Sequence, residues 1–338
     1  MSCWNRCGLK VRRGYYSLTM RLLITGGLGF VGGRLAVYLT QAGHQIVLGS
    51  RNALNSPAWL PQAGLAQIVW DDDGALERSC NGVDVVIHAA GINAQDCAAD
   101  PVAALAFNGV ATARLVAAAS RARVPRFIYL STAHVYASPL EGTITEEICP
   151  RNLHPYATSH LAGEHAVLSA NLREQIQGIV LRLSNTFGAP VHSDVNCWML
   201  LVNDLCRQAV ETHKLILHTH GLQQRDFINM VGVCRVIEQL SISNDNSLSS
   251  GLFNVGAGAS QSVLDMAQVI QKRCKQVLGF EPELCIPKNG ASESHHLLHY
   301  RSDRLTAMAS DTHANMTEID NLLRFCHSTF TQTECTNA

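Results

Sequence analysis

The sequence predicts a doubly wound, parallel α/β sheet with a smaller C-terminal α/β lobe. Short apolar segments alternate with helical patterns about every 20–40 residues, which is typical of right-handed βαβ crossovers in a parallel sheet. The segment from Met20 to Arg51 also reads as a strand, a glycine-rich turn, a helix and a second strand. This order is the first half of a dinucleotide-binding unit, so the sheet is predicted to be of the Rossmann type.

The glycine-rich turn is the strongest single signal in this unit. Thr25 opens the pattern T-G-x-x-G-x-x-G, and Gly43 ends the helix that follows. Glycines let backbone N–H groups and the positive end of a helix approach a pyrophosphate. The candidate cofactor-binding residues of this turn are Gly26, Gly29, Phe30, Val31 and Gly32.

The rest of the chain continues the alternation. We expect strands at 66–70, 83–90, 126–131, 178–183, 215–218 and 252–255, and helices at 101–123, 155 or 156–175, 198–210 and 262–277. Residues 1–19 are expected to be either a disordered extension or an artefact of the assigned start codon, since Met20 directly begins the first strand. The expected Rossmann domain comprises residues 20–190 and about 225–258, and the expected substrate lobe comprises about 191–224 and 259–330.

Composition limits the partners and the compartment. The 338 residues carry a net charge of −1, which argues against nucleic acid or an acidic membrane as an obligate partner. No uninterrupted apolar run reaches about 18 residues, so no transmembrane helix is expected. The twelve cysteines form no C-x-x-C pair, which favours buried thiols in the cytoplasm. The fifteen histidines lack the carboxylate spacing of a metal site, so no metal is expected.

Several motifs occur in one order along the chain. They are TGGLGFVG (25–32), HAAG (88–91), STAHVY (131–136), PYATSH (155–160), LRLSNTFGAP (181–190), QRDF (224–227) and FNVGAG (253–258). Together the chain resembles the extended short-chain dehydrogenase/reductase superfamily over roughly residues 20–305. Its matching branch contains NAD(P)-dependent nucleotide-sugar epimerases, dehydratases and reductases.

The resemblance assigns roles to individual residues. It implies that Thr132 hydrogen-bonds the reacting oxygen and that Tyr156 transfers the proton. It places the cofactor against Ala89, Ala90, Gly91 and Asn108, and a nucleotide sugar against Asn185 and Arg225. It further implies a homodimer that pairs through the helices at 101–123 and 156–175.

The chain departs from the family pattern Y-x-x-x-K, because His160 stands four residues after Tyr156. The family lysine holds the nicotinamide ribose and lowers the pKa of the tyrosine. A unit charge about 4 Å away contributes at most about 4 kcal/mol at an effective dielectric of about 20. A mostly neutral histidine supplies far less, although it can still bind a ribose hydroxyl. The loss of the lysine is therefore expected to slow oxidation of an alcohol, which needs a tyrosinate base, more than reduction of a ketone.

Two further departures refine the function. The acid pair that family dehydratases carry after the catalytic threonine is replaced by Ala133 and His134, so dehydration is not expected. The second expected strand ends in Ser50 and Arg51, without the acid that binds an NAD ribose. This pair suits a 2′-phosphate, so NADP is favoured over NAD. The resemblance also implies an aspartate near the adenine, which is Asp71, with Asp72 almost as suitable.

The sequence therefore predicts an NAD(P)-dependent nucleotide-sugar epimerase or keto-sugar reductase, with a leaning toward reduction. The family run R-P-G-D, which supplies a second arginine for the diphosphate, is missing, and Arg301 and Arg304 lie out of frame. The alternative is a catalytically impaired NADP-binding regulatory or scaffold protein of the same fold. Thr132 and Tyr156 favour the enzyme, whereas His160 favours the alternative.

Overall fold

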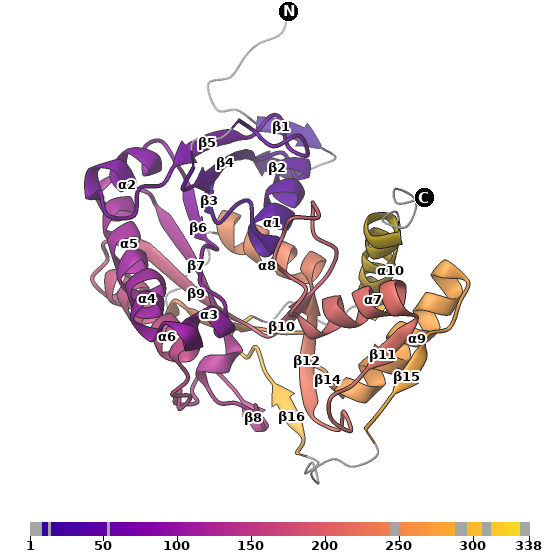
Figure 1. Cartoon of the computed structure of the whole chain (residues 1–338). Coiled ribbons are helices and arrows are strands. Elements are labelled where there is room, and N and C mark those ends of the chain that lie inside the picture. Colours follow the sequence, from indigo (N-terminus) through magenta and orange to yellow (C-terminus); the bar gives the residue numbers. More distant parts are fainter. Residues whose placement is uncertain are drawn as a thin grey trace, which may run out of the picture. The chain divides into compact units, whose positions relative to one another are not determined.

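The computed structural model describes residues 9–12, 15–52, 55–243, 250–287, 296–305 and 312–331 (Figure 1). The chain divides into two compact units, each built from several segments. The first unit comprises Met1–Leu130, His154–Val180 and Val236–Gly251, and the second comprises Ser131–Leu153, Leu181–Arg235 and Leu252–Ala338. The domain boundaries expected from the sequence stay a prediction.

A seven-stranded parallel sheet confirms the expected fold class. Its strands are β3 (Arg21–Thr25), β4 (Gln45–Ser50), β5 (Gly64–Gln67), β6 (Val85–His88), β7 (Arg126–Thr132), β9 (Gln177–Leu183) and β13 (Leu252–Val255). The order across the sheet is β13-β9-β7-β6-β3-β4-β5. Strand β3 pairs with β4 on one side and with β6 on the other, and it is buried except at its first residue.

Helices cover both faces of the strands in the first unit. They are α1 (Phe30–Gln41), α2 (Asp73–Cys80), α3 (Ala94–Ala99), α4 (Pro101–Ala104), the π-helical segment η1 (Leu105–Ala111), α5 (Thr112–Arg121) and α6 (Pro155–Leu172). In Figure 1, α2, α4, α5 and α6 lie together on one face of these strands and α1 lies on the other. Helix α1 buries Leu35, Ala36 and Leu39 against the sheet, which is the spacing of an amphipathic helix.

The second unit has its own smaller elements. They are η2 (Ala133–Val135), β8 (Gly142–Ile144), β10 (Asn185–Phe187), α7 (Leu201–Thr212), β11 (Lys214–Ile216), β12 (Gln224–Asn229), α8 (Met230–Ile242, which continues into the first unit), β14 (Ser260–Ser262), α9 (Val263–Leu278), β15 (Glu283–Cys285), β16 (Leu298–Tyr300) and α10 (Thr312–Phe330). Strand β12 pairs with β10 and β14. Helices α7, α9 and α10 enclose a core that includes Leu205, Ile270 and Leu322.

Some elements differ from the sequence expectation. Within the extension expected to be disordered, β1 (Leu9–Arg12) and β2 (Tyr15–Leu18) form an antiparallel pair; residues 1–8 and 13–14 lie outside the described residues. The third strand ends at Gln67 rather than Trp70. Ser241 and Ile242, in a polar stretch of the sequence, end α8, and residues 244–249 lie outside the described residues.

The nine cysteines in the described part of the chain are all free thiols, and seven of them are buried. This agrees with the thiols expected from the sequence.

The segment Pro101–Arg121 is long and apolar enough to span a membrane by length and composition alone, but half of its most apolar window is buried. It packs against α2 and α6. A core helix of a globular unit passes the same test of length and composition. The packing of this segment against its neighbours makes it one of the helices that cover the sheet.

One buried arginine holds together distant parts of the first unit. Arg126 is 8% exposed, and its guanidinium donates to the carbonyls of Leu240 (2.5 Å), Ser241 (2.6 Å) and Ser243 (2.6 Å). Its Nε donates to the side chain of Gln177 at 2.7 Å. The last carbonyls of a helix lack partners within the helix, so Arg126 caps α8 and ties it to the sheet.

We expect Arg126→Met to lower the free energy of unfolding by about 2–4 kcal/mol, because it leaves buried carbonyls without a donor. Urea unfolding measures this loss. The control is Arg121→Met, whose side chain is 45% exposed and pairs with Glu77; it should cost less than about 1 kcal/mol. Equal losses in the two variants would contradict the capping role of Arg126.

Candidate active site

The turn between β3 and α1 is packed too closely for side chains. Gly26 has φ +69°, and a Cβ on it would lie 2.7 Å from the backbone nitrogen of Ala90. A Cβ on Gly32 would lie 2.2 Å from the carbonyl oxygen of Gly26. Gly29 is the N-cap of α1 and makes no side-chain cap. The first N–H groups of the helix are therefore left to bind an anion.

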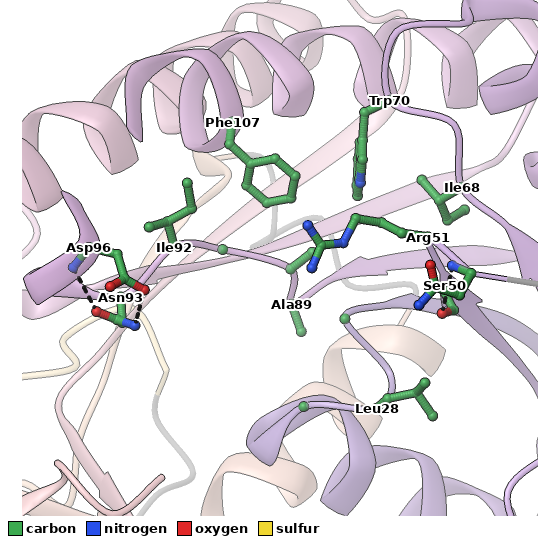
Figure 2. A pocket seen from close by; sticks show the side chains of 16 residues that line it. Leu28, Ser50, Arg51, Ile68, Trp70, Ala89, Ile92, Asn93, Asp96 and Phe107 are labelled. Carbon is green, nitrogen blue, oxygen red and sulfur yellow. Dashed lines mark hydrogen bonds between the residues drawn. The ribbon is translucent and has the colours of Figure 1, made fainter. Parts of the chain in front are cut away.

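A cavity of about 630 Å³ opens beside this turn within the first unit (Figure 2). It is lined by Gly26, Leu28, Gly29, Gly49, Ser50, Arg51, Asn52, Ile68, Trp70, Ala89, Ala90, Gly91, Ile92, Asn93, Asp96 and Phe107. Figure 2 shows the side chain of Arg51 extending between Trp70 and Ala89. The cavity thus joins a glycine cradle, aromatic walls and one cationic side chain.

The aromatic wall fits the adenine end of a dinucleotide. Trp70 and Phe107 meet edge to face with ring centroids 5.1 Å apart. The Trp70 indole Nε1 is buried and has no hydrogen-bond partner within the described chain. A buried N–H without an acceptor is costly, and an adenine or ribose acceptor would satisfy it. The residues of this structure therefore fit an adenine dinucleotide.

The expected cofactor residues fall into three groups. The cavity lining includes Gly26, Gly29, Ser50, Arg51, Ala89, Ala90 and Gly91, whereas Phe30, Val31 and Gly32 belong to the first turn of α1. Asp71 is exposed, and its segment lines the cavity through Ile68 and Trp70 instead. Asp72 caps α2 by accepting from the Ala75 N–H at 2.9 Å. Contact of either aspartate with adenine stays a prediction.

Asn108 lies in the π-helical segment η1 and is 1% exposed. Its Oδ1 accepts from the backbone N–H of Ile92 at 2.9 Å, and its Nδ2 donates to Ser159 at 3.0 Å. Asn108 therefore fixes the loop after β6, which carries Gly91, and connects it to α6. Sequence reasoning missed Trp70 and Phe107, because single aromatics in a strand end and a helix are usually core residues.

His160 is buried one helical turn after Tyr156 and is 6% exposed. Burial lowers the pKa of His160 to about 4, so the ring is neutral at pH 7. Its Nδ1 lies 2.9 Å from the hydroxyl of Tyr129. The Tyr156 ring meets the His160 ring edge to face, with centroids 4.6 Å apart. The structure thus brings Tyr156 and His160 together on one face of α6.

Tyr156 stands in the first turn of α6, after Pro155 at the start of the helix. Its backbone N–H donates to the side chain of His154 at 3.2 Å. Thr132 belongs to the second unit, at the end of β7, and is 5% exposed. Its Oγ1 accepts from the His134 N–H at 3.1 Å, which leaves the hydroxyl proton for an oxygen acceptor. That Thr132 and Tyr156 act together stays a prediction.

The two expected substrate residues lie on neighbouring strands of the second unit. Asn185 on β10 donates from Nδ2 to the carbonyl of Asp226 at 3.0 Å, and Arg225 precedes that residue on β12. The Arg225 guanidinium donates to Gln223 at 3.1 Å. Asp226 itself is buried and accepts from Ser184 and from the N–H groups of 257 and 258. This carboxylate holds the loop after β13 close to the two expected substrate residues.

The family model described as NAD dependent epimerase/dehydratase matches residues 22–256. The chain belongs to this family. Among its relatives, the dTDP-glucose 4,6-dehydratase of Streptomyces niveus is 25% identical over 269 residues, which are 75% of this chain and 78% of the relative. The dTDP-6-deoxy-L-talose 4-dehydrogenase (NAD(P)(+)) of Kitasatospora kifunensis is 30% identical over 263 residues, or 74% and 78%.

Solved structures share the fold of this family. The epimerase Mth375 of Methanothermobacter thermautotrophicus has a TM-score of 0.76 at 20% identity, covering 93% of this chain and 95% of that chain. MoeE5 in complex with UDP-glucose and NAD has a TM-score of 0.71 at 22% identity, covering 92% of this chain and 100% of that chain. RMD from Pseudomonas aeruginosa complexed with NADPH has a TM-score of 0.71 at 22% identity, covering 92% of this chain and 99% of that chain. As a member of the family whose model it matches, the chain is an NAD(P)-dependent enzyme of the extended short-chain dehydrogenase/reductase type.

We expect two of the buried histidines of the first unit, His88 and His160, to make folding sensitive to acid. Burial lowers the pKa of His88 to about 3 and that of His160 to about 4, against about 6.5 in an unfolded chain. As pH falls from about 6.5 to about 4, the unfolded chain binds more protons than the folded chain. The free energy of unfolding therefore decreases through this window.

His160→Gln should make this decrease shallower, as measured by urea unfolding at about pH 7, 6 and 5. His327→Gln, on an exposed turn of α10, should keep the wild-type decrease. A wild-type slope in His160→Gln would show that His160 takes up its proton equally in both states.

Proposed function

We propose that this enzyme reduces a keto group at a sugar carbon of a nucleotide sugar, with NADPH as the preferred hydride donor. The observation that carries the proposal is the pairing of Tyr156 with a buried, neutral His160 on α6. The cofactor supplies the hydride. The Tyr156 hydroxyl donates a proton to the oxygen of the reduced carbonyl, so the site needs the protonated tyrosine, which is its ordinary form at pH 7.

The neutral His160 explains the direction of the reaction. Oxidation of an alcohol needs Tyr156 as a base, and a cationic neighbour would stabilise its phenolate. A ring whose pKa is lowered to about 4 carries no charge at pH 7, so it gives the phenolate little support. Reduction begins with the phenol, the form already present at pH 7, and the phenolate left after proton donation regains its proton from solvent. Epimerisation requires both directions and is therefore expected to be slower than reduction.

Dehydration is not part of the proposal, although dehydratases are among the relatives. Elimination of water needs an acid and a base beside the substrate. The positions after Thr132 hold Ala133, which is 1% exposed, and His134, in place of a carboxylate pair.

A nucleotide sugar is the proposed substrate. Support comes from relatives whose names include dTDP sugars and from a neighbour that holds UDP-glucose. In this chain, Asn185 and Arg225 lie on adjacent strands, and a guanidinium suits a diphosphate by charge-assisted hydrogen bonds. Burial lowers the pKa of Arg225, but a guanidinium remains charged in proteins.

Exposed apolar side chains on helical segments of the first unit support the proposed homodimer. Val102, Val110 and Leu172 on the segments α4, η1 and α6 are 79%, 55% and 84% exposed. Apolar side chains at such exposure are suited to burial against a second copy.

A second candidate is an NADP-binding regulatory or scaffold protein with impaired catalysis. The observation that favours it is the loss of the family lysine at position 160. A protein of this kind would bind the dinucleotide without turnover, and Tyr156→Phe would then change nothing that can be measured.

We expect the purified protein to oxidise NADPH with a dTDP-4-keto-6-deoxysugar, followed by absorbance. Tyr156→Phe should slow this reaction by about 100-fold or more, because it removes the acid, and it should retain dinucleotide binding.

His160→Lys should accelerate oxidation of the matching alcohol more than reduction of the ketone. Equal effects of His160→Lys in both directions would contradict the proposed direction.

Arg51 should set the choice of dinucleotide. Its side chain lines the cavity beside Ser50, where an NADP 2′-phosphate is proposed to bind. Arg51→Ala should weaken NADPH binding about 10-fold, because a charge-assisted contact is lost, and change NADH binding less than about 2-fold. Isothermal titration measures both. Equal weakening for the two dinucleotides would mean that Arg51 does not contact the phosphate.

A further inference from the structure

We propose that Tyr129 is a positioning residue, which holds His160 in the tautomer whose Nε2–H faces the cofactor cavity. The inference rests on the proposed function only in that a dinucleotide occupies this cavity. It concerns a set of buried side chains in the first unit, of which Tyr129 stands outside the family motifs. The set links β3, β6, η1, α5, β7 and α6.

The directions of the hydrogen bonds follow from one backbone carbonyl. The Thr112 hydroxyl donates to the carbonyl of Asn108 at 2.7 Å. Its single proton is thus used, so the contact of Thr112 with His88 Nε2 at 2.9 Å must have the histidine as donor. His88 Nδ1 then carries no proton, and it accepts from Thr25 at 2.6 Å. His88 is therefore the Nε2–H tautomer.

The same reasoning applies to the second histidine. The Tyr129 hydroxyl lies 2.9 Å from His160 Nδ1 and 3.5 Å from the Asn108 carbonyl. That carbonyl already accepts the shorter bond from Thr112. The Thr112 hydroxyl, a further partner of Tyr129, already donates to Asn108 and accepts from His88. The phenolic proton is therefore best placed on the line to Nδ1, because 3.5 Å is at the limit of a hydrogen bond. His160 then accepts at Nδ1 and carries its own proton on Nε2.

The Nε2 atom of His160 lies beside a residue of the cavity wall. A Cβ on Gly91 would lie 3.8 Å from His160 Nε2 and 3.7 Å from Cε1. Gly91 lines the cavity. An Nε2–H at this place can donate to a ribose hydroxyl, which is the one role of the family lysine that a neutral ring can keep. In the other tautomer Nε2 would only accept.

A glycine on α6 makes room for the tyrosine. A Cβ on Gly163 would lie 2.8 Å from the Tyr129 hydroxyl oxygen. The rings of Tyr129 and His160 stack with centroids 5.9 Å apart and planes 26° from parallel. Tyr129 is 1% exposed, so its hydroxyl is shielded from bulk solvent. Packing and hydrogen bonding therefore fix the two rings together.

The first test is the tautomer itself. Two-bond ¹H–¹⁵N spectra of the full chain distinguish protonated from unprotonated ring nitrogens, and His160→Gln assigns the signal. We expect Nε2–H for His160 in the wild type and a mixture with Nδ1–H in Tyr129→Phe. His88 is the internal control and should remain Nε2–H in both. A His160 that carries its proton on Nδ1, or a pattern that Tyr129→Phe leaves unchanged, would overturn the proposal.

The second test is the affinity for NADPH and NADH by titration. Tyr129→Phe should weaken both about 3- to 10-fold, as expected for one misdirected hydrogen bond. The effect should vanish in the His160→Lys background, because an ammonium has no tautomers. Tyr300→Phe, which removes a buried hydroxyl in the second unit, should bind as the wild type does. Equal weakening in the histidine and lysine backgrounds would show that Tyr129 acts by packing, and would overturn the proposal.

The two claims fail in different ways. A wild-type protein that binds neither dinucleotide contradicts the proposed function, and the spectra then decide the tautomer alone. A protein that binds NADPH but shows an unchanged His160 in Tyr129→Phe keeps its function and loses the positioning residue.

Discussion

The close contact between the glycine turn and the end of β6 is the constraint on which the first unit depends. No side chain fits between Gly26 and Ala90, or between Gly32 and the Gly26 carbonyl. This contact places the start of α1, the loop at Gly91 and the ends of β4 and β6 around one cavity. His160 on α6 also lies beside Gly91, which lines this cavity.

The replacement of a lysine by a buried histidine changes what the site can do. A lysine provides charge and several donors, whereas a neutral imidazole provides one donor and one acceptor. Such a ring is useful only if its surroundings choose the tautomer. The buried hydroxyls of Thr112 and Tyr129, together with the Asn108 carbonyl, give each of the two histidines its direction.

The fold and the glycine turn that lines the cavity could be predicted from the sequence, because strand periodicity and glycine turns are local signals. The sequence predicted β13 at 252–255 without error. It expected one unbroken helix at 101–123, where the structure has a π-helical segment that directs Asn108 inward. That break and the Trp70 wall depend on tertiary packing. Tyr129 was also missed, since an aromatic in a strand such as RFIYLS is read as core until its hydroxyl partner is known.

The most direct test of the account is the identity of small molecules that the purified protein releases on denaturation, determined by mass spectrometry. An enzyme that reduces a substrate and exchanges its dinucleotide on each turnover should be purified with little bound cofactor and should then take up NADPH reversibly. Tightly held NAD⁺ in nearly every molecule would instead indicate an epimerase that regenerates its own cofactor. That result would contradict both the proposed direction and the proposed role of Arg51.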